Sequence, residues 1–130
     1  MRVLFVDDDP LLRRLGDHAL RDLGGMSVTT AADGVEALDL VDRVAPDAIL
    51  LDYLMPGMNG DEVLAILQSS PATRNIPVVF LTAVEDEDEL RRLVAAGAIG
   101  CLLKPFDPRT LAEDLESVLL RVPDHDVSPS

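Results

Sequence analysis

Carboxylates stand at the ends of two short apolar runs. Asp7, Asp8 and Asp9 follow the first run, and Asp52 ends another one. Two unit charges about 4 Å apart repel by roughly 4 kcal/mol at an effective dielectric constant near 20, so a cluster of Asp7, Asp8 and Asp52 needs a cation or protonation. Oxygen ligands with room for water favour Mg²⁺ over zinc or copper, which prefer histidine or cysteine. These residues therefore predict a magnesium site.

Two other side chains, Thr82 and Lys104, follow or end the later apolar runs. A divalent ion and a lysine together suit a dianionic phosphoryl group, and a threonine hydroxyl can donate a hydrogen bond to it. Asp52 would then be the nucleophile. On its own, Asp52 would be interpreted as a helix-cap or turn aspartate. Its combination with Asp7, Asp8, Thr82 and Lys104 favours the interpretation as a nucleophile.

The elements that must position these side chains are short apolar runs that alternate with segments of helical period. The runs lie at residues 3–6, near Val28, and at 48–51, 78–81 and 99–103. This alternation predicts βαβ crossovers and a parallel sheet covered on both faces. We expect an α/β, flavodoxin-like, doubly wound (βα)5 fold with a five-stranded parallel sheet of order 2-1-3-4-5. Ligands then bind at the carboxyl ends of strands one and three, beside the switch point.

Capping signals predict where the helices begin. Asp9 precedes Pro10 and is a better N-cap than a third metal ligand. The apolar residues that follow at helical spacing are Leu11, Leu12, Leu15, Ala19 and Leu23. The other predicted helices begin with a capping box at Asp33 and Glu36, after Asn59-Gly60, in the acidic run 85–89, and at Asp107-Pro108.

Length and charge limit the classes of function. A chain of 130 residues with 48% hydrophobic content builds one domain of ordinary size. Its 24 acidic and 11 basic residues give a net charge of -13, which repels nucleic acid and anionic membranes. We therefore expect no nucleic acid or membrane partner for this chain. The single cysteine, Cys101, and the lack of a signal-peptide core predict a cytoplasmic location.

Four motifs in order carry a resemblance to a known family. They are "VDDDP" at 6–10, "ILLDYLMPGMNG" at 49–60, "VVFLTA" at 78–83 and "GAIGCLLKPF" at 97–106. Together they resemble the receiver domain of two-component response regulators. The resemblance covers residues 1–121, and we expect 122–130 to be a flexible C-terminal tail. It implies a phosphoacceptor domain of a phosphorelay, which is a signalling domain that catalyses only its own phosphorylation and dephosphorylation.

The resemblance also implies roles for particular residues. Asp52 matches the phosphoacceptor, and Asp7 and Asp8 match the acidic pair that positions Mg²⁺. The backbone carbonyl of Leu54 matches the remaining protein ligand of the ion. Thr82 matches the hydroxyl residue that moves to contact the phosphoryl group.

Lys104 matches the lysine of the family, and its peptide bond to Pro105 should be cis. The implied phosphoryl donor is a phosphohistidine on a sensor histidine kinase or a histidine phosphotransfer protein. The implied output is a change in affinity for a downstream effector domain or protein, through the fourth helix, fifth strand and fifth helix. A homodimer through this surface is an open alternative.

The sequence departs from the family at three positions. Cys101 stands where the family usually carries Tyr or Phe, which predicts a weaker or differently built switch. Leu54 and Val84, two residues beyond Asp52 and Thr82, cannot orient an attacking water, which predicts slow self-dephosphorylation. Tyr53, next to Asp52, either gates access to the site or packs over the loop.

Other functions fit less well. A pseudo-receiver that works without phosphorylation is the main alternative. A Mg²⁺-dependent phosphohydrolase with an aspartyl-phosphate intermediate needs a second aspartate where Leu54 stands, and a cap for which the chain has no spare length. A flavin-binding flavodoxin needs a Ser/Thr/Gly-rich phosphate loop, and the acidic cluster would repel its cofactor.

Overall fold

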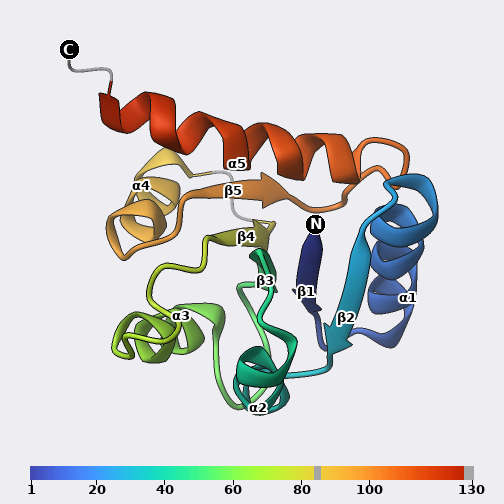
Figure 1. The fold of residues 1–130 in the computed structure, drawn as a ribbon, viewed down its shortest axis with the longest axis horizontal. Coiled ribbons are helices and arrows are strands. Elements are labelled where there is room, and N and C mark those ends of the chain that lie inside the picture. Colours follow the sequence, from blue (N-terminus) through green and yellow to red (C-terminus); the bar gives the residue numbers. More distant parts are fainter. Residues whose placement is uncertain (84–85, 128–130) are drawn as a thin grey trace.

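A computed structural model describes residues 1–83 and 86–127, with side chains described through residue 120. Its elements appear in Figure 1 in the order β1 (Arg2–Val6), α1 (Pro10–His18), η1 (Ala19–Leu23), β2 (Ser27–Ala31), α2 (Gly34–Val44), β3 (Ala48–Asp52), α3 (Gly60–Gln68), β4 (Val78–Thr82), α4 (Glu87–Ala95), β5 (Gly100–Leu103) and α5 (Leu111–Val127). Here η1 is a short π-helical turn that continues α1. Strands and helices alternate as the sequence predicts.

The five strands form one parallel sheet of order β2-β1-β3-β4-β5. This confirms the predicted flavodoxin-like topology. Asp52 pairs in register with Leu81, and Thr82 pairs with Leu103. The carboxyl ends of the central strands therefore lie at one edge of the sheet.

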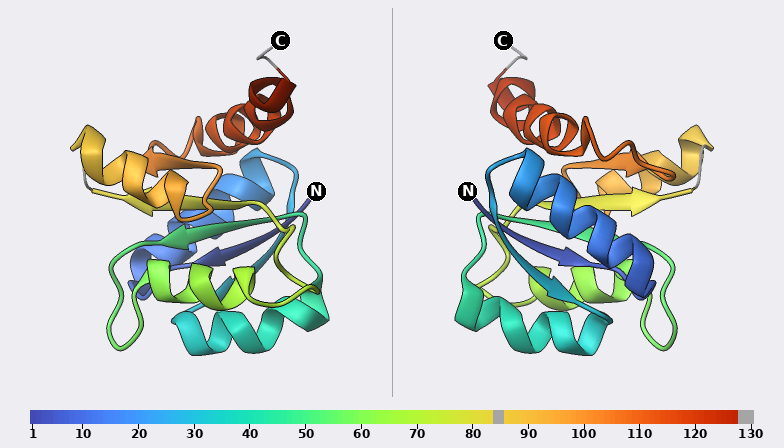
Figure 2. Two further views of the ribbon diagram at one scale, coloured as in Figure 1. Left: turned by 90° about the vertical axis from the view of Figure 1, so that its left-hand side faces the viewer. Right: turned by 90° about the vertical axis from the view of Figure 1, so that its right-hand side faces the viewer.

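Helices cover both faces of the sheet (Figure 2). On one face, α1, η1 and α5 bury a core that includes Phe5, Leu20, Leu50, Leu81 and Leu115. On the other face, α2, α3 and α4 bury a second core, which we call the α2–α4 core; it includes Leu51, Val63, Leu64, Phe80 and Leu93. Burial of one such side chain contributes about 1.5–3 kcal/mol, so the two cores hold the strand ends in place.

The start of α1 is fixed by its cap and by one glycine. The Asp9 carboxylate accepts hydrogen bonds from the backbone N–H groups of Leu11 at 2.9 Å and Leu12 at 3.4 Å, which confirms Asp9 as the N-cap. Gly16 faces Phe5 so closely that a Cβ atom there would lie 2.1 Å from the ring. The helix therefore rests directly on β1, the strand that leads to Asp7.

The last helix, α5, ends at Val127, beyond the residue-121 boundary expected from the sequence. The division into a domain at 1–121 and a flexible tail at 122–130 stays a prediction. Within the described part of the chain, no helix combines the length and the apolar character that crossing a membrane requires.

Candidate functional site

The predicted site residues meet at the carboxyl edge of the sheet. Asp52 and Thr82 are the last residues of β3 and β4, while Asp7 follows β1 and Lys104 follows β5. They line one cavity of about 260 Å³, whose full lining is Asp7, Asp8, Asp9, Leu12, Asp52, Leu54, Thr82, Ala83 and Lys104. Residues from four strand ends thus share one space.

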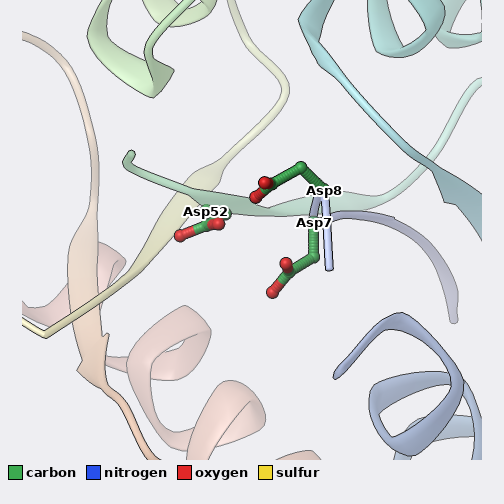
Figure 3. Close-up of side chains that lie close together, drawn as sticks. All are labelled: Asp7, Asp8 and Asp52. Carbon is green, nitrogen blue, oxygen red and sulfur yellow. The ribbon is translucent and has the colours of Figure 1, made fainter. Parts of the chain in front are cut away.

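Three carboxyl groups gather at the ends of β1 and β3 (Figure 3). One oxygen atom from each of Asp7, Asp8 and Asp52 lies within 4.8 Å of the others. Asp7 and Asp52 are buried, whereas Asp8 is exposed. The group offers only oxygen ligands and one open side, so it can hold a hard divalent cation that keeps part of its water shell.

Lys104 is the only lysine of the chain, and its ammonium group faces two of these carboxylates. Its Nζ atom lies 3.0 Å from Asp52 Oδ1 and 3.3 Å from Asp7 Oδ2. Burial alone would lower the pKa of Lys104, but the ion pairs with Asp52 and Asp7 outweigh burial and raise it above the ordinary value. Lys104 therefore carries a fixed positive charge at the floor of the cavity.

The surroundings of Asp52 disfavour its ionised form. The pKa of Asp52 is raised from an ordinary 3.8 to about 6: burial is the largest cause, the charges of Asp7 and Asp8 act in the same direction, and the hydrogen bond and charge of Lys104 act in the opposite direction. A cation between the carboxylates would favour the ionised form, because opposite charge lowers the pKa of a carboxyl group. The geometry thus makes the nucleophilic form of Asp52 dependent on neighbouring positive charge.

Backbone contacts hold Asp7 in position. Its N–H group donates to the Ala31 carbonyl at 3.1 Å, and its Oδ1 atom accepts from the Asp9 N–H at 2.9 Å. Arg13 donates from Nη1 to the Asp7 carbonyl at 2.8 Å. The place of Leu12 in the cavity lining and the hydrogen bond from Arg13 were not predicted. Both residues lie in the first helical turn after the aspartates, and this position is the sequence signal that could have indicated them.

Four other positions were singled out in the sequence, and one of them, Leu54, lines the cavity. Leu54 lines the cavity with a side chain that is 63% exposed. Val84 lies outside the described residues. The Lys104–Pro105 peptide is cis, as the resemblance implies. Cys101 is partly buried against the α2–α4 core, where burial raises the pKa of its thiol.

Tyr53 does not line the cavity, although it follows Asp52 directly. Its ring meets Phe80 edge-on, with 5.7 Å between ring centroids and an interplanar angle of 89°. Its hydroxyl group accepts a hydrogen bond from Arg92 at 2.9 Å. Of the two predicted alternatives, the contacts of Tyr53 favour packing over gating.

The sequence is similar to those of known proteins. The response regulator receiver domain family matches residues 3–116. The chemotaxis protein CheY of Pseudomonas aeruginosa is 34% identical over 122 residues, which cover 94% of this chain and 98% of that protein. The DNA-binding response regulator MtrA of Mycolicibacterium smegmatis is 37% identical over 92% of this chain, which spans 51% of that longer protein.

Solved structures show the same likeness. The chemotaxis response regulator CheY4 of Vibrio cholerae superposes with a TM-score of 0.84 at 37% identity, over 90% of this chain and 97% of that one. The receiver domain of the Francisella response regulator 1452 superposes with a TM-score of 0.81 at 29% identity, over 92% of this chain and 97% of that one. These neighbours share the fold over nearly their whole length.

Proposed function

This chain belongs to the response regulator receiver family and is a two-component phosphoacceptor domain, and from that premise we propose that Asp52 is the residue that accepts the phosphoryl group. The observation that carries the proposal is the position of Asp52. Its carboxyl group is buried in a cavity of about 260 Å³, 3.0 Å from the Lys104 ammonium group, and clustered with Asp7 and Asp8.

The residues present fit a magnesium ion. Three carboxylates share one space with a single lysine, so negative charge is in excess, and the donor set contains only oxygen. We propose that Asp7, Asp8 and Asp52 hold Mg²⁺ together with the backbone carbonyl of Leu54. When bound, the ion neutralises the oxygens of the phosphoryl group.

The chemical step is a transfer from nitrogen to oxygen. A carboxylate oxygen of Asp52 attacks the phosphorus atom of a phosphohistidine, the P–N bond breaks, and its electron pair remains on the imidazole nitrogen. Lys104 stabilises the negative charge on the phosphoryl oxygens, and the Thr82 hydroxyl donates a hydrogen bond to one of them. Ala83 is small and lies at the cavity, which leaves room for the donor.

The proposed partners follow from this chemistry. The donor is a sensor histidine kinase or a histidine phosphotransfer protein, and the output is a downstream effector domain or protein. The net charge of -13 argues against binding of nucleic acid by this chain itself. The cytoplasmic location and a homodimer stay predictions.

The test is a measurement of phosphoryl uptake. The protein is incubated with Mg²⁺ and acetyl phosphate, and intact masses are compared for the wild type, Asp52→Asn and Asp39→Asn. Asp39 is an exposed aspartate of α2 and serves as the matched control. We expect a gain of one phosphoryl group in the wild type and in Asp39→Asn, and none in Asp52→Asn.

Two results would contradict the proposal. A gain that persists in Asp52→Asn would place the acceptor elsewhere. No gain in the wild type, with Mg²⁺ binding confirmed separately, would indicate a receiver fold that works as an interaction module without phosphotransfer.

A further inference from the structure

Tyr53 connects the loop after the phosphoacceptor to α4. It is separated by 39 positions from Arg92, whose Nη2 atom donates to the Tyr53 hydroxyl at 2.9 Å. The Tyr53 ring also packs edge-on against Phe80 of β4, an arrangement that contributes about 0.5–1.5 kcal/mol beyond area burial. One side chain thus joins the loop after β3, strand β4 and helix α4.

The backbone of Tyr53 is held on both sides. Its N–H group donates to the Leu81 carbonyl at 3.2 Å, and its carbonyl accepts from the Gly60 N–H at 2.7 Å, at the first residue of α3. The peptide groups that flank Tyr53 therefore cannot move without moving these contacts.

Helix α4 has little other anchorage in the described side chains. Leu93 is the one residue of the helix that is buried. Arg91 pairs with Glu87 and Asp88 of the same helix. Arg92 pairs with Glu89 and also reaches Tyr53, so its guanidinium group links α4 to another part of the fold.

The loop after β3, which this hydrogen bond joins to α4, borders the cavity, and so does the end of β4. Leu54 follows Tyr53 in the loop after β3, and Ala83 follows β4 on the way to α4; both line the cavity over Asp52. A phosphoryl group on Asp52 would enter the space between these two segments and add negative charge there. The Tyr53–Arg92 hydrogen bond therefore links the loop beside this space to α4.

Two aromatic rings pack together on this face of the sheet, Phe80 of β4 and Tyr53 of the loop after β3. Cys101 of β5 pairs in register with Phe80, and both Cys101 and Tyr53 pack against the α2–α4 core. A thiol side chain is too small to reach α4 in the way a ring can. The side chain that contacts Arg92 of α4 belongs to Tyr53, which stands in the loop after Asp52 and not on β5.

We propose that the Tyr53–Arg92 hydrogen bond couples the phosphoryl state of Asp52 to the position of α4. The inference rests on the proposed function, because it requires a phosphoryl group on Asp52. Occupation of the cavity shifts the loop that carries Tyr53, and α4 follows through Arg92. The surface of α4 is then what an effector reads.

The experiment compares amide hydrogen exchange of residues 87–95 with and without Mg²⁺ and beryllofluoride, a phosphoryl mimic. Tyr53→Phe removes the hydroxyl and keeps the ring, while Arg92→Met removes the donor and keeps the side-chain length. Arg91→Met is the matched control, since Arg91 pairs with Glu87 and Asp88 of its own helix. In the wild type we expect the mimic to change exchange in α4 by about threefold or more. Tyr53→Phe and Arg92→Met should lose most of this change, and Arg91→Met should keep it.

Phosphoryl uptake from acetyl phosphate, measured by intact mass on the same proteins, separates the two proposals. Uptake in both the wild type and Tyr53→Phe with an equal α4 response would overturn the coupling and leave the phosphoacceptor proposal standing. Loss of the response in Arg91→Met to the same degree as in Arg92→Met would also overturn it, because helix charge would then be the cause. An absence of uptake in the wild type would refute both.

Discussion

The Lys104 ammonium group lies 3.0 Å from Asp52 and 3.3 Å from Asp7, so one cation serves two buried carboxylates. Asp8 adds a third negative charge at the open side of the cavity. Within this cluster the positive charge does not balance the negative charge.

Mg²⁺ should stabilise the folded protein. A ligand at 100 times its Kd adds about 2.7 kcal/mol to the free energy of unfolding if it binds only the native state. We expect the Tm of the wild type to rise with Mg²⁺ concentration and to fall back when EDTA is added. Asp8→Ala should weaken this response. Asp39→Ala, at an exposed position of α2, should not. An equal Tm shift in Asp8→Ala would place the ion elsewhere.

The stability of the metal-free protein should depend on the titration of Asp52. Its pKa rises from an ordinary 3.8 to about 6 in the folded state, mainly because it is buried. Folding therefore favours the protonated form, so the wild type loses stability as pH rises from below 4 to above 6. By linkage the loss is roughly 3 kcal/mol.

Asp52→Asn carries no such group and should be the more stable protein at pH 7.5. The difference should shrink toward pH 4, where wild-type Asp52 is largely protonated. Urea unfolding of both proteins at several pH values, without divalent cations, measures it. A stability difference that stays constant between pH 4 and pH 7.5 would contradict the raised pKa.

Lys104→Met should slow phosphoryl uptake. The substitution keeps an apolar stem and removes the charge that faces Asp52 and Asp7, and loss of one such stabilising group costs about 10²–10³ in rate. Lys104→Arg should recover only part of the rate, because guanidinium geometry differs from that of an ammonium group. Time courses of mass gain with acetyl phosphate measure the effect. A rate within twofold of the wild type would remove Lys104 from the chemistry.

Leu54→Glu should accelerate loss of the phosphoryl group. Leu54 lines the cavity and cannot orient a water molecule, so the wild type should dephosphorylate slowly. A carboxylate at this position should raise the rate by roughly tenfold or more. The decay of the phosphorylated mass after removal of acetyl phosphate tests this. Leu11→Glu, an exposed position on α1 outside the cavity, is the control and should leave the decay unchanged.

Gly16→Ala should destabilise the fold. An added Cβ atom would lie 2.1 Å from Phe5 Cε2, so the ring or α1 must shift, at a cost of about 1–3 kcal/mol. Chemical denaturation measures the change in the free energy of unfolding. In the double variant with Phe5→Leu the two costs should not add, since the clash is removed. Additive costs would show that Gly16 matters for another reason.

Much of the site was predictable because its residues stand at strand ends. Apolar runs predicted the strands, strict alternation with helices predicted a parallel sheet, and a parallel sheet brings its carboxyl ends to one edge. Asp7, Asp52, Thr82 and Lys104 were therefore expected together, and they line one cavity. Helix starts were also predictable, because a cap such as Asp9 acts on the two or three residues that follow it.

The buried faces of helices were less predictable. Of the five apolar residues predicted to form one helix face, Ala19 is buried and Leu12 is half-buried, whereas Leu11, Leu15 and Leu23 are exposed. Gly16 and Leu20 face the core instead, since close packing on Phe5 fixes the rotation of α1 about its axis. Hydrophobic spacing indicates a helix, but the neighbouring strand decides which side of it is buried.

The strand order and the edge at which the carboxylates meet were predictable from the sequence, because they depend on local pattern and on the rules of parallel sheets. The contacts of Tyr53 were not predictable from the sequence. Its contacts with Phe80 and Arg92 join residues 27 and 39 positions apart, and no local pattern signals them. The charge balance around Lys104 and the raised pKa of Asp52 likewise depend on burial and on distances between strands, which exist only once the sheet has formed.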